Sequence, residues 1–175
     1  ELFVSAGPDI VKRVRDTGAS VFLDLKFHDI PNTVAKAVAS ATRLDVQMLT
    51  VHTSGGSAML QGALKGATEG AKQTGNEAPL ILGVTVLTSM DESDLNEVSV
   101  NKTPEAQVIH LAQMATSAGL KGLVCSPKEI APLREVLPRE VKLVTPGIRP
   151  VGSETGDQKR VMSPTEAIEV GADWL

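Results

Sequence analysis

The alternation of short apolar runs with longer stretches of helical period constrains the fold of this chain more than any other feature. The runs of strand length are residues 21–26, 46–51, 80–87, 122–125 and 141–145, and residues 173–175 begin another. Apolar side chains recur at helical spacing in the intervening stretches. Because strands that alternate with helices form βα units, this pattern predicts a parallel sheet covered by helices.

Helix-start signals support this interpretation. Residues 126–129 and 163–166 each read Ser-Pro-x-Glu, a capping box with proline at the first helical position. Thr103 followed by Pro104 is a third, weaker start. We also expect a helix over about residues 8–17, and residues 1–3 resemble the tail of an earlier strand.

Uninterrupted βα units indicate an α/β fold, either a doubly wound sheet or a (β/α)8 TIM barrel. A barrel of this kind needs about 250 residues or slightly fewer, and this chain has 175. We therefore expect residues 1–175 to form a single barrel domain, incomplete in this chain, with about six to seven βα units. Residues 150–160 are polar and glycine-bearing, so they are expected to form an exposed, mobile loop.

Composition excludes several classes of function. No stretch of 18 or more apolar residues occurs, so a membrane span is not expected. A net charge of −4 with both signs interspersed, and an aromatic content of 2%, argue against a nucleic-acid partner. The single cysteine, Cys125, cannot form an internal disulfide, which favours a reducing compartment such as the cytoplasm.

Two charged residues in the first full strand are the sharpest candidates for chemistry. Alternate side chains of a strand share a face, so Leu23 and Leu25 should pack under helices. Asp24 and Lys26 then point together toward the barrel interior, at the strand end where barrel enzymes keep catalytic groups. The alternative is a solvent-facing ion pair on an edge strand. The apolar flank and the adjoining polar turn favour the functional interpretation, because a charged pair in a barrel mouth is costly.

Later strand ends carry weaker signals. Arg149 follows a Pro-Gly turn, and its guanidinium suits a phosphate, although a surface arginine after a turn is commoner. Thr88 ends another apolar run, where capping is an equally good explanation. The three histidines share no metal-ligand spacing and are expected to be structural or solvated. No nucleotide-cofactor motif is present.

Residues 24–33, DLKFHDIPNT, resemble the signature of the orotidine 5′-phosphate decarboxylase family, bacterial type. Residues 83–90, 145–149 and 157–161 resemble its later segments in the right order, and residues 1–8 resemble the stretch after its second strand. The resemblance covers essentially the whole chain. It implies that segments found at both ends of the family's barrel are lacking here, including two active-site residues near the start and a phosphate-binding pair near the end.

The resemblance implies an enzyme, a carboxy-lyase that converts orotidine 5′-monophosphate to UMP in the last step of de novo pyrimidine nucleotide synthesis. It implies no metal or organic cofactor, and a homodimer with active sites near the interface. Carried over by position, Lys26 protonates C6 of the pyrimidine and Asp24 lies against the substrate carboxylate. Asp29, Ile30 and Thr33 are then contributed across the interface to the neighbouring subunit's site.

The same resemblance assigns the remaining substrate contacts. Thr88 contacts the pyrimidine, Gln158 holds the base and phosphate, and Arg149 binds the phosphate. Two other functions are compatible with the same sequence features. A sugar-phosphate decarboxylase or epimerase on a similar barrel would use an Asp-x-Lys strand with a metal, and EDTA would inactivate it. A phosphate-binding module or inactive paralogue would show no turnover of orotidine monophosphate.

Overall fold

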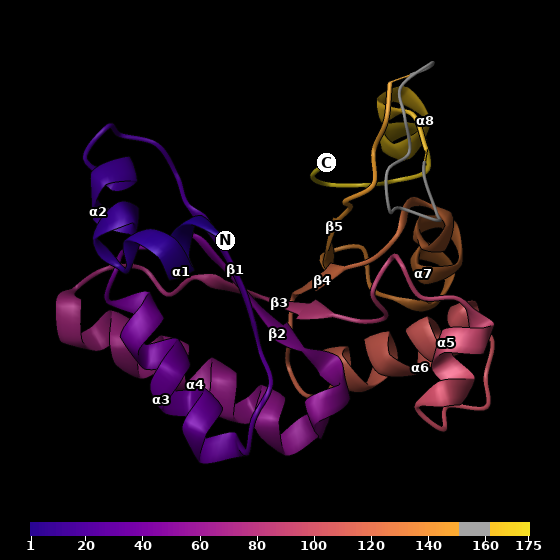
Figure 1. The fold of residues 1–175 in the computed structure, drawn as a ribbon, viewed down its shortest axis with the longest axis horizontal. Helices are drawn as coiled ribbons and strands as arrows, with labels where there is room; N and C mark the ends of the chain where they lie inside the picture. Colours follow the sequence, from indigo (N-terminus) through magenta and orange to yellow (C-terminus); the bar gives the residue numbers. More distant parts are fainter. Residues whose placement is uncertain (151–161) are drawn as a thin grey trace. The chain divides into compact units, whose positions relative to one another are not determined.

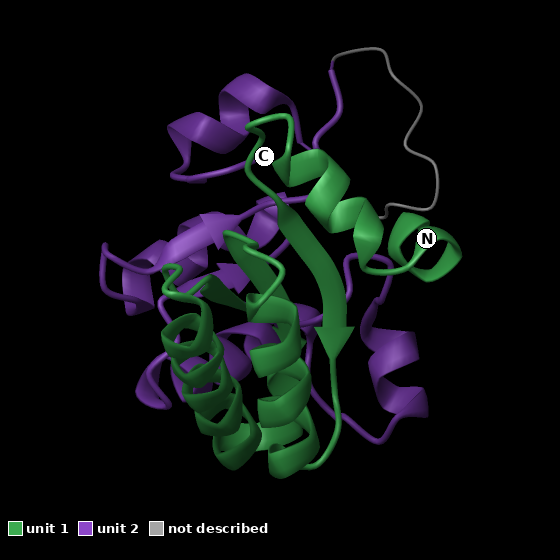
Figure 2. Cartoon of the chain, turned by 90° about the vertical axis from the view of Figure 1, so that its left-hand side faces the viewer, with its two compact units in different colours: residues 1–82 green, residues 83–175 purple. Residues whose placement is uncertain are grey.

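The structure, a computed structural model, describes residues 1–150 and 162–175 (Figure 1). The chain divides into two compact units, residues 1–82 and 83–175 (Figure 2). The loop expected over residues 150–160 therefore lies almost wholly outside the described residues, as does the candidate Gln158.

Each of the five predicted runs contains a strand, although the strand predicted over residues 80–87 ends at Val84. The strands are β1 (Phe22–Phe27), β2 (Met48–His52), β3 (Leu80–Val84), β4 (Gly122–Val124) and β5 (Lys142–Val144). Their order in the sheet is β1-β2-β3-β4-β5, and both β1–β2 and β4–β5 pair in parallel. Each strand thus lies beside the next along the chain. The run at residues 173–175 also begins to pair, because Trp174 bridges Val144 of β5 in parallel.

The helices fill the stretches between the strands. They are α1 (Leu2–Ala6), α2 (Asp9–Arg15), α3 (Pro31–Thr42), α4 (Gly56–Thr74), α5 (Glu92–Glu97), α6 (Pro104–Ser117), α7 (Ile130–Val136) and α8 (Pro164–Glu169). Two 3-10 turns, η1 (Thr53–Gly55) and η2 (Pro127–Glu129), precede α4 and α7. The start predicted at Ser163 is confirmed, since its hydroxyl and the Glu166 carboxylate cap each other's backbone N–H. Thr103 caps α6 by accepting from the Ala106 N–H at 3.3 Å.

Two local features differ from expectation. Residues 1–3 are not a strand tail: they begin α1, where the Ser5 N–H donates to the Glu1 carbonyl at 3.1 Å. A three-residue apolar run carries too little periodicity to separate a strand from a helical turn. Helix α5 was not expected, although Asp91 caps it by accepting from the backbone N–H groups of Ser93 and Asp94.

In residues 1–82, helices α3 and α4 pack unusually closely, and Figure 2 shows them side by side. Gly62, Gly66 and Gly70 face α3 along one line of α4, and a Cβ at Gly66 would lie 2.1 Å from the Ala35 carbonyl oxygen. The absent side chains let the two backbones meet. The fully buried large side chains of this unit include Val34, Val38, Leu49, Met59 and Leu60.

In residues 83–175, an ion-pair cluster joins the last described segment to β5. Arg134 Nη2 and Lys142 Nζ contact the two carboxylate oxygens of Asp173 at 2.6 and 2.9 Å. The same carboxylate accepts from the Leu143 N–H at 2.8 Å. Because the Arg134 side chain is only 9% exposed, this cluster is a structural clamp rather than a surface pair.

Candidate active site

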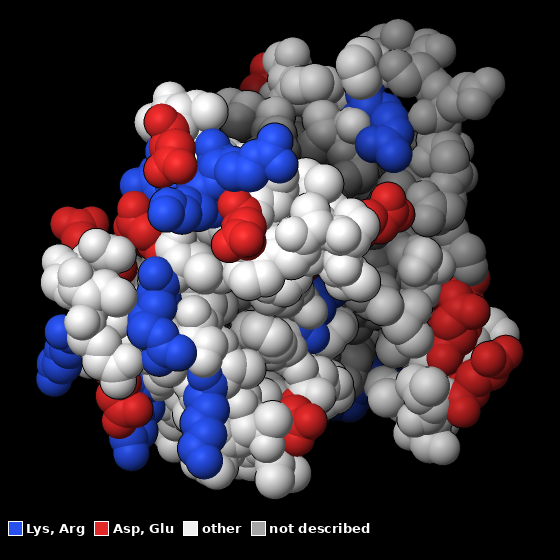
Figure 3. All heavy atoms as spheres, turned by 60° about the vertical axis from the view of Figure 1, so that its left-hand side comes forward, with Lys and Arg blue, Asp and Glu red and all other residues white. Residues whose placement is uncertain are grey.

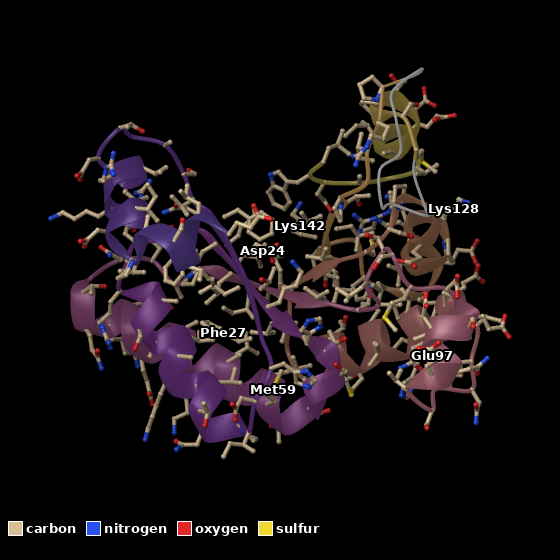
Figure 4. All side chains as sticks on the ribbon, in the orientation of Figure 1. Asp24, Phe27, Met59, Glu97, Lys128 and Lys142 are labelled. Carbon is tan, nitrogen blue, oxygen red and sulfur yellow. The ribbon has the colours of Figure 1, made fainter. Side chains whose placement is uncertain are left out.

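Asp24 and Lys26 lie together on β1, as predicted, and Lys26 is one residue before the C-terminal end of the strand. Lys26 Nζ donates to Asp24 Oδ2 at 2.5 Å, and Figure 4 labels Asp24 beside this strand. The alternation that predicted a shared face also holds for Leu23, which is buried on the opposite face. The pair therefore presents an ammonium and a carboxylate at one strand end, where a small ligand can meet both.

A threonine on the neighbouring strand completes this group. Thr50 of β2 is fully buried, and its hydroxyl donates to Asp24 Oδ1 at 2.8 Å. The backbone N–H of Lys26 donates to the same hydroxyl oxygen at 2.9 Å. Thr50 thus contacts both members of the charged pair, a role that the sequence analysis did not predict.

The pairing of β1 with β2 is irregular at this point. Leu23 lies opposite Leu49, but Phe27 lies opposite Val51, so β1 uses more residues than β2 between the two pairs. Lys26 accommodates the extra length with a φ of 49°, in the left-handed region. Such a φ is uncommon for a residue other than glycine and costs on the order of 1 kcal/mol. The irregularity thus lies at the residue that carries the ammonium, and bulges are common next to active sites.

The charged pair is not enclosed. The side chains of Asp24 and Lys26 are 46% and 37% exposed, so the expected position inside a barrel mouth is not observed within residues 1–82. On β1, Phe22 and Asp24 are exposed while Leu23 is buried, which means that this unit covers one face of the strand only. An exposed ion pair of this kind contributes little stability by itself.

Two histidines lie next to the pair. His28 follows the end of β1 and His52 is the last residue of β2, and their ring centroids are 5.5 Å apart. Burial lowers the pKa of His52, and the positive charges of His28 and Lys26 lower it further, while Asp24 acts in the opposite direction. From the sequence, both histidines are expected to be structural or solvated. Their proximity depends on the pairing of β1 with β2, which their spacing in the sequence does not reveal.

The three residues predicted to reach a neighbouring subunit lie together at an exposed corner between β1 and α3. The Asp29 carboxylate accepts from the Ile30 N–H at 2.6 Å. Ile30 precedes α3 and is 68% exposed, and Thr33 is exposed in the first turn of that helix. These positions suit an interface, but the homodimer itself stays a prediction.

Thr88 and Arg149 belong to residues 83–175 and follow the ends of β3 and β5. Thr88 is half-buried. The backbone N–H of Arg149 donates to the Met162 carbonyl at 2.9 Å, and its Nη1 donates to the Ile148 carbonyl at 2.9 Å. Gly147 has a φ of 82°, which explains the glycine in this turn. Both candidates thus lie in the segments that follow the strands, Thr88 four residues after the end of β3 and Arg149 five residues after the end of β5, and their roles stay predictions.

On the face shown in Figure 3, lysines and arginines lie interspersed with aspartates and glutamates. Among residues 1–150 and 162–175, no helix is long and apolar enough to cross a membrane. Within the same residues, no group of three or more His, Cys, Asp and Glu side chains is placed to hold a metal ion.

A parallel sheet whose strands follow one another in chain order, with helices between them and an acid–lysine pair near a strand end, is typical of the barrel enzymes among α/β proteins. The family described as orotidine 5′-phosphate decarboxylase / HUMPS matches residues 1–175. The chain therefore belongs to this family, which confirms the expectation of a carboxy-lyase of the orotidine 5′-phosphate decarboxylase type.

Known relatives agree with this assignment. The orotidine 5′-phosphate decarboxylases of Opitutus terrae and Pseudoalteromonas translucida are 56% and 54% identical to the chain over 175 residues. These matches cover 100% of this chain and 74% and 73% of the relatives. The crystal structure of orotidine 5′-phosphate decarboxylase from Lactobacillus acidophilus superposes with a TM-score of 0.85 at 38% identity. That match covers 97% of this chain and 71% of the other, and confirms the predicted TIM-barrel fold, of which this chain contains a part.

Proposed function

We propose that this protein decarboxylates orotidine 5′-monophosphate to UMP in pyrimidine nucleotide synthesis. The observation that carries the proposal is the Lys26 ammonium held against Asp24 at the end of β1, in a chain that belongs to the decarboxylase family. The names of the relatives supply the substrate, and the geometry of β1 supplies the group that the reaction needs. The protein would act as one barrel domain, and the single, buried Cys125 favours the cytoplasm.

The chemical step breaks the bond between C6 of the pyrimidine and the carboxylate carbon. The electron pair of that bond stays on C6, and CO2 leaves. A fixed ammonium beside C6 stabilises the developing negative charge, which is electrostatic preorganisation. Lys26 then donates a proton to C6, giving UMP and a neutral amine that solvent reprotonates. One side chain therefore serves both as electrostatic stabiliser and as general acid.

Asp24 would hold the ammonium in place and lie against the substrate carboxylate. The short Lys26–Asp24 contact leaves the ammonium little freedom to swing away from the strand end. Repulsion between Asp24 and the substrate carboxylate would also raise the energy of the bound substrate. Asp24 is needed to position Lys26 even without that repulsion. The lysine supplies the ammonium and the acid two positions earlier holds it in place, so the proposed reaction needs both residues.

The remaining predicted contacts complete the proposal. Arg149 would bind the phosphate, since a guanidinium presents a planar fork to phosphate oxygens, and Thr88 would contact the pyrimidine. Gln158, which lies outside the described residues, would hold base and phosphate. In a homodimer, the exposed corner formed by Asp29, Ile30 and Thr33 would reach the neighbouring site. Phosphate binding far from C6 can supply energy to order the site.

Replacement of Lys26 by alanine tests the proposal. In the full-length protein, we expect Lys26→Ala to lower kcat by on the order of a thousandfold or more, because charge stabilisation and proton donation are lost together. Turnover is followed by the falling ultraviolet absorbance of orotidine monophosphate, and binding of UMP by calorimetry should persist. Lys36→Ala, an exposed lysine on α3, is the matched control and should keep wild-type turnover. Retention of a tenth of kcat by Lys26→Ala would remove Lys26 as the proton donor, and a wild-type protein inactive on this substrate would refute the function.

A further inference from the structure

We propose that Thr50 is a positioning residue for the decarboxylation, which fixes the acid–lysine pair of β1 through its hydroxyl. The inference rests on the proposed function, since it assigns a role in the same site. Thr50 does not need to touch the substrate for this role. Its hydroxyl would act through Lys26 and Asp24, the two groups that do.

Three hydrogen bonds form a closed ring around this hydroxyl. The Lys26 N–H donates to Thr50 Oγ1 at 2.9 Å, Thr50 Oγ1 donates to Asp24 Oδ1 at 2.8 Å, and Lys26 Nζ donates to Asp24 Oδ2 at 2.5 Å. A hydroxyl carries one proton, so a hydroxyl that accepts from Lys26 has that proton available for Asp24. Both carboxylate oxygens are then occupied, and the plane of the carboxylate is set.

The ring is anchored at its buried end. Thr50 and its neighbours Leu49 and Val51 are fully buried in β2, whereas the side chains of Asp24 and Lys26 are each more than a third exposed. An exposed ion pair does not hold its geometry by itself, because solvent screens it and both side chains can rotate. The fixed point of the group is therefore the β2 hydroxyl.

The hydroxyl also stabilises an unusual backbone conformation. Lys26 has a φ of 49°, and the β1–β2 register shifts between Leu23 and Phe27. At such an irregularity the regular ladder bond of the N–H is lost. Thr50 Oγ1 accepts from this N–H instead. A side chain without a hydroxyl would leave the N–H without this acceptor and weaken the conformation that directs Lys26 toward Asp24.

The test compares Thr50→Val, which has nearly the same shape but no hydroxyl, with Thr50→Ser, which keeps the hydroxyl. In the full-length protein, Thr50→Val should lower kcat roughly tenfold to a hundredfold, the effect of one hydrogen bond to a charged group. KM for orotidine monophosphate should change less than about threefold, and Thr50→Ser should restore most of kcat. Thr42→Val is the matched control, because Thr42 is also buried in this unit and its hydroxyl donates to Val38. It should lower stability without lowering kcat.

Amide hydrogen exchange gives a readout that does not depend on turnover. The Lys26 amide should be protected in the wild type and in Thr50→Ser, and should lose protection in a folded Thr50→Val or Thr50→Ala protein. A wild-type kcat in Thr50→Val, an effect on KM alone, or an equal loss in Thr50→Ser would overturn the proposal. An unprotected Lys26 amide in the wild type would overturn it even if the valine variant failed to fold. A wild-type protein that protects this amide but does not turn over the substrate would instead refute the proposed function.

Discussion

Replacement of Gly66 by alanine should destabilise the protein, although alanine is the better helix former. A Cβ at this position would lie 2.1 Å from the Ala35 carbonyl oxygen, where ordinary contacts begin at 3.4 Å. The contacted atom belongs to the backbone of α3, so a side-chain rotation cannot relieve the clash, and the helices must move apart by about 1 Å.

The size of the effect follows from two opposing terms. Alanine in place of glycine stabilises a helix interior by about 1 kcal/mol. Overpacking in a well-packed core costs about 1–3 kcal/mol, and the backbone contact places Gly66 at or above the upper end of that range. We therefore expect a net loss of about 2 kcal/mol in the free energy of unfolding, which corresponds to a decrease of about 4–8 °C in Tm for a protein of this size.

Urea denaturation followed by circular dichroism measures this change. Gln61→Ala is the matched control, because Gln61 is exposed on the same helix, and its stability should stay within about 0.5 kcal/mol of wild type. Gly62→Ala should be intermediate, since its Cβ would meet the Pro31 carbonyl oxygen at 2.8 Å. If Gly66→Ala were as stable as Gln61→Ala, the close approach of α3 and α4 would not be a feature of the folded protein.

Two predictions concern pH. Burial raises the pKa of Asp173, but hydrogen bonds from Lys142, the Leu143 N–H and Arg134 outweigh it and hold that pKa below its usual 3.8. The ionised Asp173 carboxylate therefore contributes to folding stability above about pH 4. This contribution is lost as the pH falls through the pKa of Asp173 in the folded protein. Asp173→Asn should thus cost about 2 kcal/mol at pH 7 and less at pH 3 by urea denaturation, and an equal cost at both would contradict the clamp. Burial, then His28 and Lys26, lower the pKa of His52 below 6.5, so folding stability should decline as pH falls below 6.5. His52→Gln should flatten that decline and His110→Gln, exposed on α6, should not; an unchanged slope in His52→Gln would exclude this role.

The fold could be predicted where the signal is local. The apolar run of β4, for example, is followed within two residues by the Ser126 capping box. Helix α5 was missed because it spans six residues, too few for a helical stripe, and its capping by Asp91 was the only signal in the sequence. The first residues were assigned wrongly for the same reason.

The residues of the candidate site could likewise be predicted only where the signal is local. Asp24 and Lys26 could be found because two positions along one strand return to the same face. Thr50 could not, since its contact with them depends on the register between β1 and β2, which an irregularity in β1 alters. The His28–His52 contact depends on the same pairing. Spacing within one element is encoded locally, whereas register between two elements is a property of the folded sheet.

The backbone conformation of Lys26 lowers the stability of β1 at the residue that carries the proposed catalytic ammonium. A glycine would adopt a φ of 49° without steric cost, but it carries no ammonium. A lysine placed in regular strand geometry would avoid the strain, but its N–H would then join the strand ladder instead of the Thr50 hydroxyl. Asp45 of the same unit also has a positive φ, of 59°, and Arg15 holds its carboxylate at 2.6 Å. At Lys26 the proposed function accounts for the strained conformation, because a strained residue persists where its side chain must occupy one position.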